Sequence, residues 1–169
     1  MTLDRYIRSF PRVLRIEPAS ICNLKCSLCP TGTTKMPRGL MTAATFQLIW
    51  EEIKSNIESV KVVALYLGGE PFLNKDFGGM VRRIKSLGVP LVKTVSNGML
   101  LTGVLMEEII DNGLDIIDFS LDGQSPEENN FLRRNSNFST VVANIKRLIE
   151  VKREKGGNPR NLYCKYPIS

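Results

Sequence analysis

Hydrophobic residues follow two different spacings, which alternate along the chain. Short apolar runs such as VKVVALYL, residues 60–67, are nearly continuous, which is typical of a strand that is buried on both faces. Between these runs, apolar residues recur every three or four positions, as in TAATFQLIWEEIKSNI, residues 42–57. That spacing predicts amphipathic helices. Alternation of strands and helices predicts an α/β fold with a parallel sheet and right-handed crossovers.

The predicted elements form four β/α units and the start of a fifth. Thr42 is a plausible N-cap, Gly88 and Gly113 are expected to end two of the helices, and Gly156 with Gly157 the last one. Strands are expected at residues 12–18, 60–67, 90–96, 114–123 and 161–168, and helices at residues 42–57, 76–88, 102–113 and 138–157.

The pattern alone is compatible with a doubly wound sheet or with a barrel. A complete eight-unit barrel takes about 250 residues, so these 169 residues can make only a partial (β/α) barrel of about four and a half units. We expect a single domain over residues 1–169. Since the chain stops directly after a predicted strand, we expect it to be truncated and to associate through that open edge.

Composition and charge indicate where in the cell the protein works and which classes of partner it binds. Hydrophobic residues make up 43% of the chain, but no apolar run approaches a membrane span and the N-terminus has no apolar signal region. We therefore expect a cytoplasmic, reducing location without a membrane partner. The net charge is +6, yet Lys and Arg alternate with Glu in IKRLIEVKREK, residues 145–155, as on a solvated helix face. This pattern favours a protein that does not bind nucleic acid.

Histidine is absent from the sequence, which excludes histidine-based catalysis and histidine-ligated metals. Three of the four cysteines, Cys22, Cys26 and Cys29, lie in one loop after the first predicted strand, whereas Cys164 is isolated. Structural zinc usually needs four ligands, and a disulfide would leave an odd thiol. Three thiols in a compact loop favour an iron–sulfur cluster with one open iron. A zinc-stabilised module with a basic RNA-facing surface is the alternative.

The spacing C-x3-C-x2-C after a first strand resembles the signature of the radical S-adenosylmethionine (radical SAM) superfamily. Further motifs follow at the ends of later strands, so the resemblance covers about residues 12–150 and is strongest to members with a C-terminal SPASM or related cluster-binding domain. These motifs are YLGGEPFL at 66–73, SNGMLL at 96–101, FSLDG at 119–123 and FLRRNSNFSTVVANIKRL at 131–148.

The resemblance implies that Cys22, Cys26 and Cys29 hold three irons of a 4Fe-4S cluster, while S-adenosylmethionine chelates the fourth. An electron from an external donor would then cleave S-adenosylmethionine and give a 5'-deoxyadenosyl radical, which abstracts hydrogen from an unknown peptide or small molecule. A cluster-binding but inactive chain is a further possibility.

The resemblance also implies roles for residues outside the cysteine loop. Gly68 and Gly69 would let the backbone approach the ligand, and Glu70 would accept a hydrogen bond from the methionine ammonium. Arg133 or Arg134 would pair with the cofactor's carboxylate, with Arg133 in the better register. The remaining candidates for cofactor contact are Leu28, Asn97 and Ser120. Cys164 is expected to be a small buried hydrophobe rather than a ligand.

Overall fold

The computed structural model describes residues 10–155 and 163–165, and its centre is a five-stranded parallel sheet. The strand order follows the chain order, with each strand hydrogen-bonded to the next. This arrangement confirms the predicted α/β class and the partial barrel. The strands are β1 Val13–Ile16, β2 Val62–Leu65, β3 Leu91–Ser96, β4 Ile116–Phe119 and β5 Tyr163–Lys165.

All four predicted helices are present, together with three short ones that the pattern did not predict. Thr42 caps α2, because its hydroxyl accepts a hydrogen bond from the Thr45 N–H at 3.1 Å. Gly88 and Gly113 follow α3 and α4 with φ of 85° and 81°, which suits glycine after a helix end. The helices are α1 Pro30–Thr33, α2 Ala43–Ser55, the 3-10 turn η2 Pro71–Leu73, α3 Phe77–Ser86, α4 Gly103–Asp111, α5 Pro126–Leu132 and α6 Phe138–Glu154. Gly156 and Gly157 lie outside the described residues.

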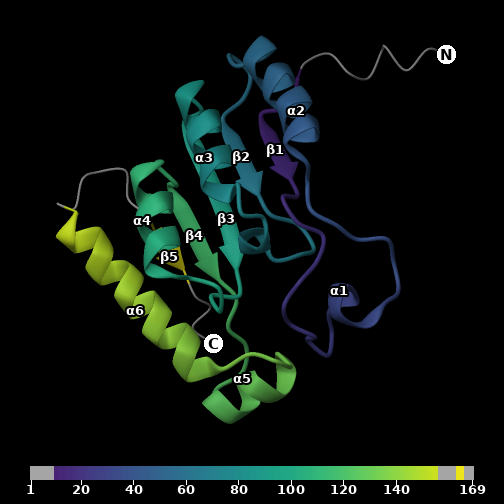
Figure 1. Ribbon diagram of the computed structural model, residues 1–169, viewed down its shortest axis with the longest axis vertical. Coiled ribbons are helices and arrows are strands. Elements are labelled where there is room, and N and C mark those ends of the chain that lie inside the picture. The colour runs from purple at the N-terminus through teal and green to yellow at the C-terminus, as the bar shows by residue number, and fades with distance from the viewer. Residues whose placement is uncertain (1–9, 156–162, 166–169) are drawn as a thin grey trace.

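The four long helices form one layer against one face of the sheet (Figure 1). Burial alternates along β3 and β4 in step with this: Val92, Thr94 and Ile117 face the helices and are buried, while Lys93 and Asp118 on the other face are partly exposed. The burial on both faces that the sequence predicted for residues 60–67 is confirmed in β2, whose last three residues are all buried. In β3 and β4 only the helix side is fully buried. The other face corresponds to the interior of a barrel.

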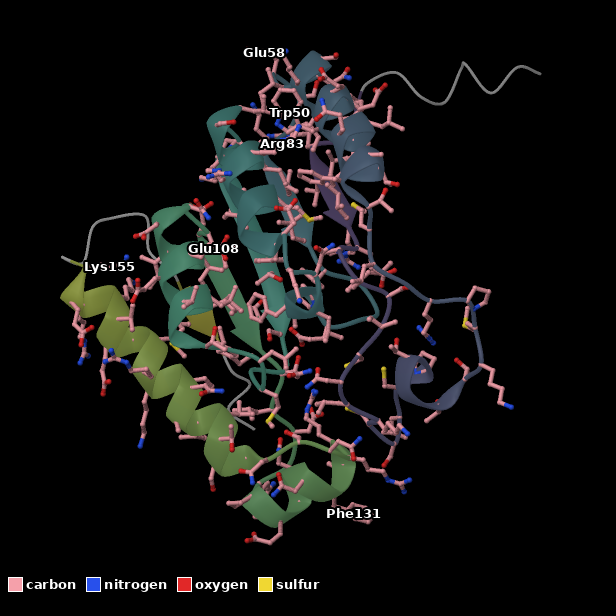
Figure 2. The ribbon with its side chains drawn as sticks, viewed as in Figure 1. Trp50, Glu58, Arg83, Glu108, Phe131 and Lys155 are labelled. Atoms are coloured by element: carbon pink, nitrogen blue, oxygen red, sulfur yellow. The ribbon has the colours of Figure 1, made fainter. Side chains whose placement is uncertain are left out.

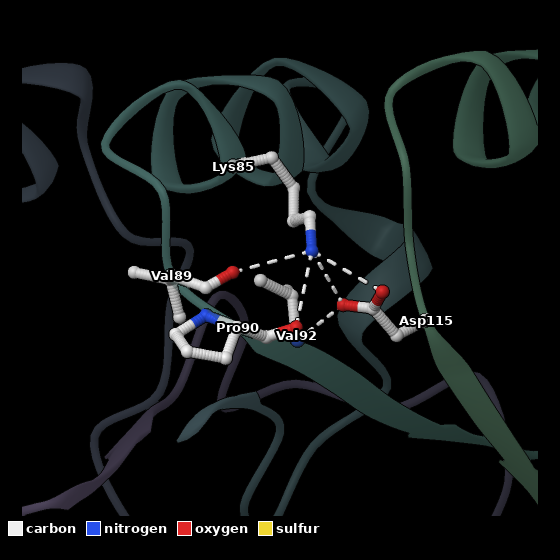
Figure 3. Close-up of polar contacts among 5 residues, drawn as sticks. All are labelled: Lys85, Val89, Pro90, Val92 and Asp115. Carbon is white, nitrogen blue, oxygen red and sulfur yellow. Dashed lines mark hydrogen bonds and ion pairs between the residues drawn. The ribbon is translucent and has the colours of Figure 1, made fainter. Parts of the chain in front are cut away.

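Two side-chain contacts hold the helices in place: one joins α2 to α3, and the other joins α3 to the sheet. On the α2–α3 contact, the Trp50 indole N–H donates to the Arg83 carbonyl at 3.0 Å, and the Arg83 guanidinium lies 4.9 Å from the Trp50 ring centroid (Figure 2). Between α3 and the beginnings of β3 and β4, Lys85 of α3 bonds Asp115 at 2.8 Å and also reaches the carbonyl of Val89 (Figure 3). These contacts lie away from the carboxyl ends of the strands, where the cysteine loop, η2 and α5 gather.

No helix in residues 10–155 is long and apolar enough to cross a membrane.

Candidate functional site

A cavity of about 590 Å³ opens at the carboxyl ends of β1 to β4, the edge where ligands bind in parallel α/β folds. All the residues predicted from the sequence to hold a metal or cofactor line it. They come from the connections that follow β1, β2, β3 and β4, and in the last connection α5 separates Ser120 from Arg133. These residues are Cys22, Cys26, Leu28, Cys29, Gly68, Gly69, Glu70, Asn97, Ser120 and Arg133. Their roles stay predictions, but the fold brings all of them to one cavity.

The three thiols of the cysteine loop, residues 22–29, are free and partly buried. Burial raises the pKa of the Cys22 thiol, and it also raises the pKa of Cys26, where the charge of Arg133 acts in the opposite direction. Among the described residues, no three Cys, Asp or Glu side chains are already close enough to hold a metal ion. Binding of an iron–sulfur cluster would displace the protons of these thiols, since the thiolate is the ligand.

A second segment, residues 132–134 at the end of α5 and just after it, pairs with the cysteine loop. The Lys25 N–H donates to the Arg134 carbonyl at 2.9 Å, and the Ser27 N–H donates to the Leu132 carbonyl at 3.0 Å. Cys26 lies between these two bonds, opposite Arg133. The structure thus places Arg133, rather than the exposed Arg134, in the cavity.

Arg133 enters the cavity already oriented by a carboxylate. Its Nη2 lies 2.8 Å from Asp122 Oδ2, while its Nε is buried without a hydrogen-bond partner. Asp122 belongs to the FSLDG motif but was not singled out from the sequence. Since one side of the guanidinium is free to donate, Arg133 can still bind an anionic group such as a carboxylate.

The glycine turn, residues 68–70, packs directly against the cysteine loop. A Cβ at Gly69 would lie 2.1 Å from the Ala19 carbonyl oxygen, so this position has no room for a side chain. Glu17 Oε1 accepts the N–H groups of Gly68 at 2.7 Å and Gly69 at 3.2 Å. Sequence reasoning missed Glu17; its place at the end of β1, on the cavity edge, was the available signal.

Glu70 is the most deeply buried carboxylate of the cavity wall, with 2% of its surface exposed. It accepts hydrogen bonds from the Ser96 hydroxyl at 2.9 Å and from the Asn97 N–H at 2.8 Å. Burial raises the pKa of Glu70 to about 7, even though these donors favour the charged form. No lysine or arginine in the described residues forms an ion pair with it. A cation in the cavity would relieve this cost.

The other candidates contribute in different ways. Asn97 is buried and donates through Nδ2 to Asn23 at 2.8 Å and to the Cys22 sulfur at 3.8 Å, so it supports the cysteine loop. Ser120 lies on the cavity wall next to β3. Leu28 is 92% exposed, which leaves its apolar side chain available to a ligand.

The residues present fit a thiolate-bound cluster with an amino-acid ligand beside it. Three thiols, a buried carboxylate and a partly free guanidinium meet at one cavity, with glycines where a backbone could approach a ligand. Within the described chain, three buried side-chain polar atoms have no partner, and all three belong to the cysteine loop or to residues that contact its neighbours: Ser27 Oγ, Arg38 Nε and Arg133 Nε. Of the three atoms, only Arg133 Nε belongs to a residue that lines the cavity, so it is the donor that a bound group would satisfy.

Comparison with known proteins decides the family. The model of the radical SAM superfamily matches residues 16–158, most of the chain. The chain belongs to the radical SAM superfamily. This result confirms the resemblance. It also confirms the cofactor prediction at the level of the family, because the family uses a 4Fe-4S cluster and S-adenosylmethionine. The zinc-stabilised module is not supported by this assignment.

Individual radical SAM relatives agree with it. The chain is 31% identical over 149 residues to a probable GTP 3',8-cyclase of Methanococcus maripaludis, covering 88% of this chain and 48% of that protein. It is 29% identical to a tungsten-containing aldehyde ferredoxin oxidoreductase cofactor-modifying protein of Pyrococcus furiosus, covering 86% and 40%. The chain thus spans about half the length of the curated relatives it matches.

A solved structure shows the same fold. SuiB of Streptococcus suis, crystallised with S-adenosylmethionine, superposes on 94% of this chain and 34% of its own, with a TM-score of 0.73 and 23% sequence identity. The chain therefore shares its fold with part of a protein that was crystallised with S-adenosylmethionine.

Proposed function

We propose that this chain is the cofactor-binding part of a radical SAM enzyme, a single core domain over residues 1–169 that works in the cytoplasm. Cys22, Cys26 and Cys29 would hold a 4Fe-4S cluster, and the cavity beside them would hold S-adenosylmethionine. When bound and reduced, the cluster supplies the electron that cleaves S-adenosylmethionine to methionine and a 5'-deoxyadenosyl radical.

The observation that carries this proposal is the buried carboxylate of Glu70. It lies in the wall of the same cavity as the three thiols and has hydrogen-bond donors but no ion-pair partner among the described residues, and the charge of Arg133 offsets its burial only in part. An amino-acid ammonium would complete this site, and Arg133, with its unpartnered Nε, would take the carboxylate of the same ligand. The two groups of opposite charge suit the two ends of a zwitterion.

The protein's own groups hold the two proposed contact segments in place. Glu17 and the packing of Gly69 on Ala19 hold the glycine turn, and the backbone pairing at Lys25 and Ser27 holds the cysteine loop near Arg133. Ser120 and the exposed Leu28 would remain available to the adenosyl portion of the cofactor.

The substrate would be a peptide or a small molecule, and an external donor would supply the electron. The similarity to probable GTP 3',8-cyclases makes GTP the first small molecule to test. The partly exposed inner face of β3 and β4, with Lys93 and Asp118, adjoins the cavity and would face that substrate.

The test is anaerobic reconstitution with iron and sulfide, then incubation with S-adenosylmethionine and dithionite, with 5'-deoxyadenosine as the product measured. We expect product from the wild type and none from Cys26→Ala. The same assay with Glu70→Ala should show a higher requirement for S-adenosylmethionine, because one charge-assisted hydrogen bond of about 1.5–3 kcal/mol is lost. A reconstituted wild type that holds four irons and forms no product would refute the catalytic proposal and leave a cluster-binding role.

A further inference from the structure

Arg38 lies outside every motif of the family resemblance, yet its side chain makes more contacts around the cysteine loop than any thiol does. Its Nη1 donates to the Ser20 carbonyl at 3.1 Å and to Thr31 Oγ1 at 3.3 Å. Its Nη2 donates to the Pro30 carbonyl at 2.9 Å and to Thr34 Oγ1 at 3.3 Å. The two terminal nitrogens therefore use all four of their N–H groups.

These acceptors stand on both sides of the three cysteines. Ser20 precedes Cys22 by two positions, and Pro30 follows Cys29 directly. A single guanidinium thus joins the entry and the exit of the cysteine loop. Ser20 is also held from the other side: its N–H donates to the Gly39 carbonyl at 2.9 Å, and its hydroxyl accepts from the Gly39 N–H at 2.8 Å.

Arg38 also connects the cysteine loop to the glycine turn through one intermediate. The Thr31 hydroxyl accepts from Arg38 and donates to the Gly68 carbonyl at 2.6 Å. Chains of this kind polarise one another and hold their members in one arrangement. The loop of proposed cluster ligands and the turn of proposed S-adenosylmethionine contacts therefore share one network.

The contacts of Arg38 are confined to this loop region. All four of its acceptors belong to residues 20–34, and none lies in a strand of the sheet or in the long helices α2, α3, α4 and α6. Loss of the side chain should therefore loosen residues 20–34 without unfolding the sheet.

We propose that Arg38 is a positioning residue that closes the cysteine loop and holds it against the glycine turn. This inference rests on the proposed function in one respect only, namely that the loop receives the cluster. The role requires the forked guanidinium of Arg38, because its two terminal nitrogens reach two carbonyls on opposite sides of the loop. The single ammonium of a lysine cannot reach both. The role concerns retention of the cluster and order of the loop, and no step of the chemistry.

The test compares Arg38→Ala and Arg38→Lys with Lys35→Ala, a matched control that removes an exposed cation from the same loop. Two quantities are measured: amide hydrogen exchange of residues 20–34 in the metal-free protein, and the rate at which a chelator removes iron from the reconstituted protein. For Arg38→Ala we expect both rates to rise about tenfold, with an unchanged thermal midpoint of the sheet. Arg38→Lys should recover less than half of the loss, and Lys35→Ala should match the wild type.

The outcomes separate this inference from the proposed function. Wild-type exchange rates in Arg38→Ala would overturn the positioning role, whatever the protein binds. Equal iron loss from the Arg38→Ala and Lys35→Ala proteins would overturn it as well. A wild type that takes up no iron would overturn the proposed function, and the exchange measurement would still decide whether Arg38 closes the loop.

Discussion

At the scale of single residues, two opposing influences act on the charge of the Glu70 carboxyl in the metal-free protein. Its carboxylate is buried, which disfavours the charge, but it accepts hydrogen bonds that favour it. Burial dominates, and the pKa rises from 4.5 to about 7. A bound ammonium would reverse this balance, so the residue suits a site that is completed by a cation.

The raised pKa of Glu70 predicts a pH dependence of folding stability. The folded chain holds this proton more tightly than the unfolded chain, so stability is largest below the ordinary pKa and is lost as pH rises through about 7. The loss should approach about 3 kcal/mol. Glu70→Gln cannot ionise and should remove this slope. Urea unfolding of the metal-free protein at several pH values checks it, and an unchanged slope in the variant would assign the titration to another group.

Residues at the ends of strands were predictable, whereas residues that support them were not. Cys22, Glu70 and Asn97 stand in short motifs directly after strands, and the parallel fold gathers such positions at one edge. Glu17 and Arg38 act through backbone acceptors and donors that only the folded loops bring near. The sequence carries no periodic signal for such contacts.

At the scale of elements, Lys85 and Asp115 join α3 to the start of β4 and to β3 (Figure 3). Asp115 Oδ2 accepts both the Lys85 ammonium at 2.8 Å and the Val92 N–H at 2.7 Å. The two side chains are only 17% and 10% exposed. Breaking such a pair leaves a poorly solvated charge without its partner.

Asp115→Ala should therefore lower the free energy of unfolding by about 3 kcal/mol, near the lower end for a buried pair. The matched control is Asp111→Ala, which removes the partner of Lys155 from a more exposed pair and should cost less than about 1 kcal/mol. Denaturant unfolding of both variants measures the difference. Equal effects would show that the Lys85 pair contributes no more than a surface contact.

Long elements were predictable because their apolar spacing repeats over several turns, as in α2 and α6. Short ones lack that repeat and are set by local capping. For α5 a usable signal was present in SPEE, residues 125–128: Ser125 accepts from the Glu128 N–H at 3.1 Å, and Pro126 stands in the first turn. For α1, the position is dictated by contacts with Arg38 and Gly68, which no local pattern reveals.

At the scale of the whole molecule, the arrangement of the sheet explains why distant motifs act together. Four loops converge because four parallel strands end at one edge in chain order. The isolated fourth cysteine differs from the other three, since Cys164 lies inside β5, where its backbone pairs with Ile117 of β4. Its role as a non-ligand stays a prediction.

The central claim is that Cys22, Cys26 and Cys29, and not Cys164, hold an iron–sulfur cluster. The most direct measurement is the iron and sulfide content of anaerobically reconstituted wild type and of the four single Cys→Ala variants. We expect about four irons and four sulfides per chain in the wild type and in Cys164→Ala, and almost none after replacement of Cys22, Cys26 or Cys29. A wild type with one zinc and no sulfide, or equal iron loss in all four variants, would contradict the account.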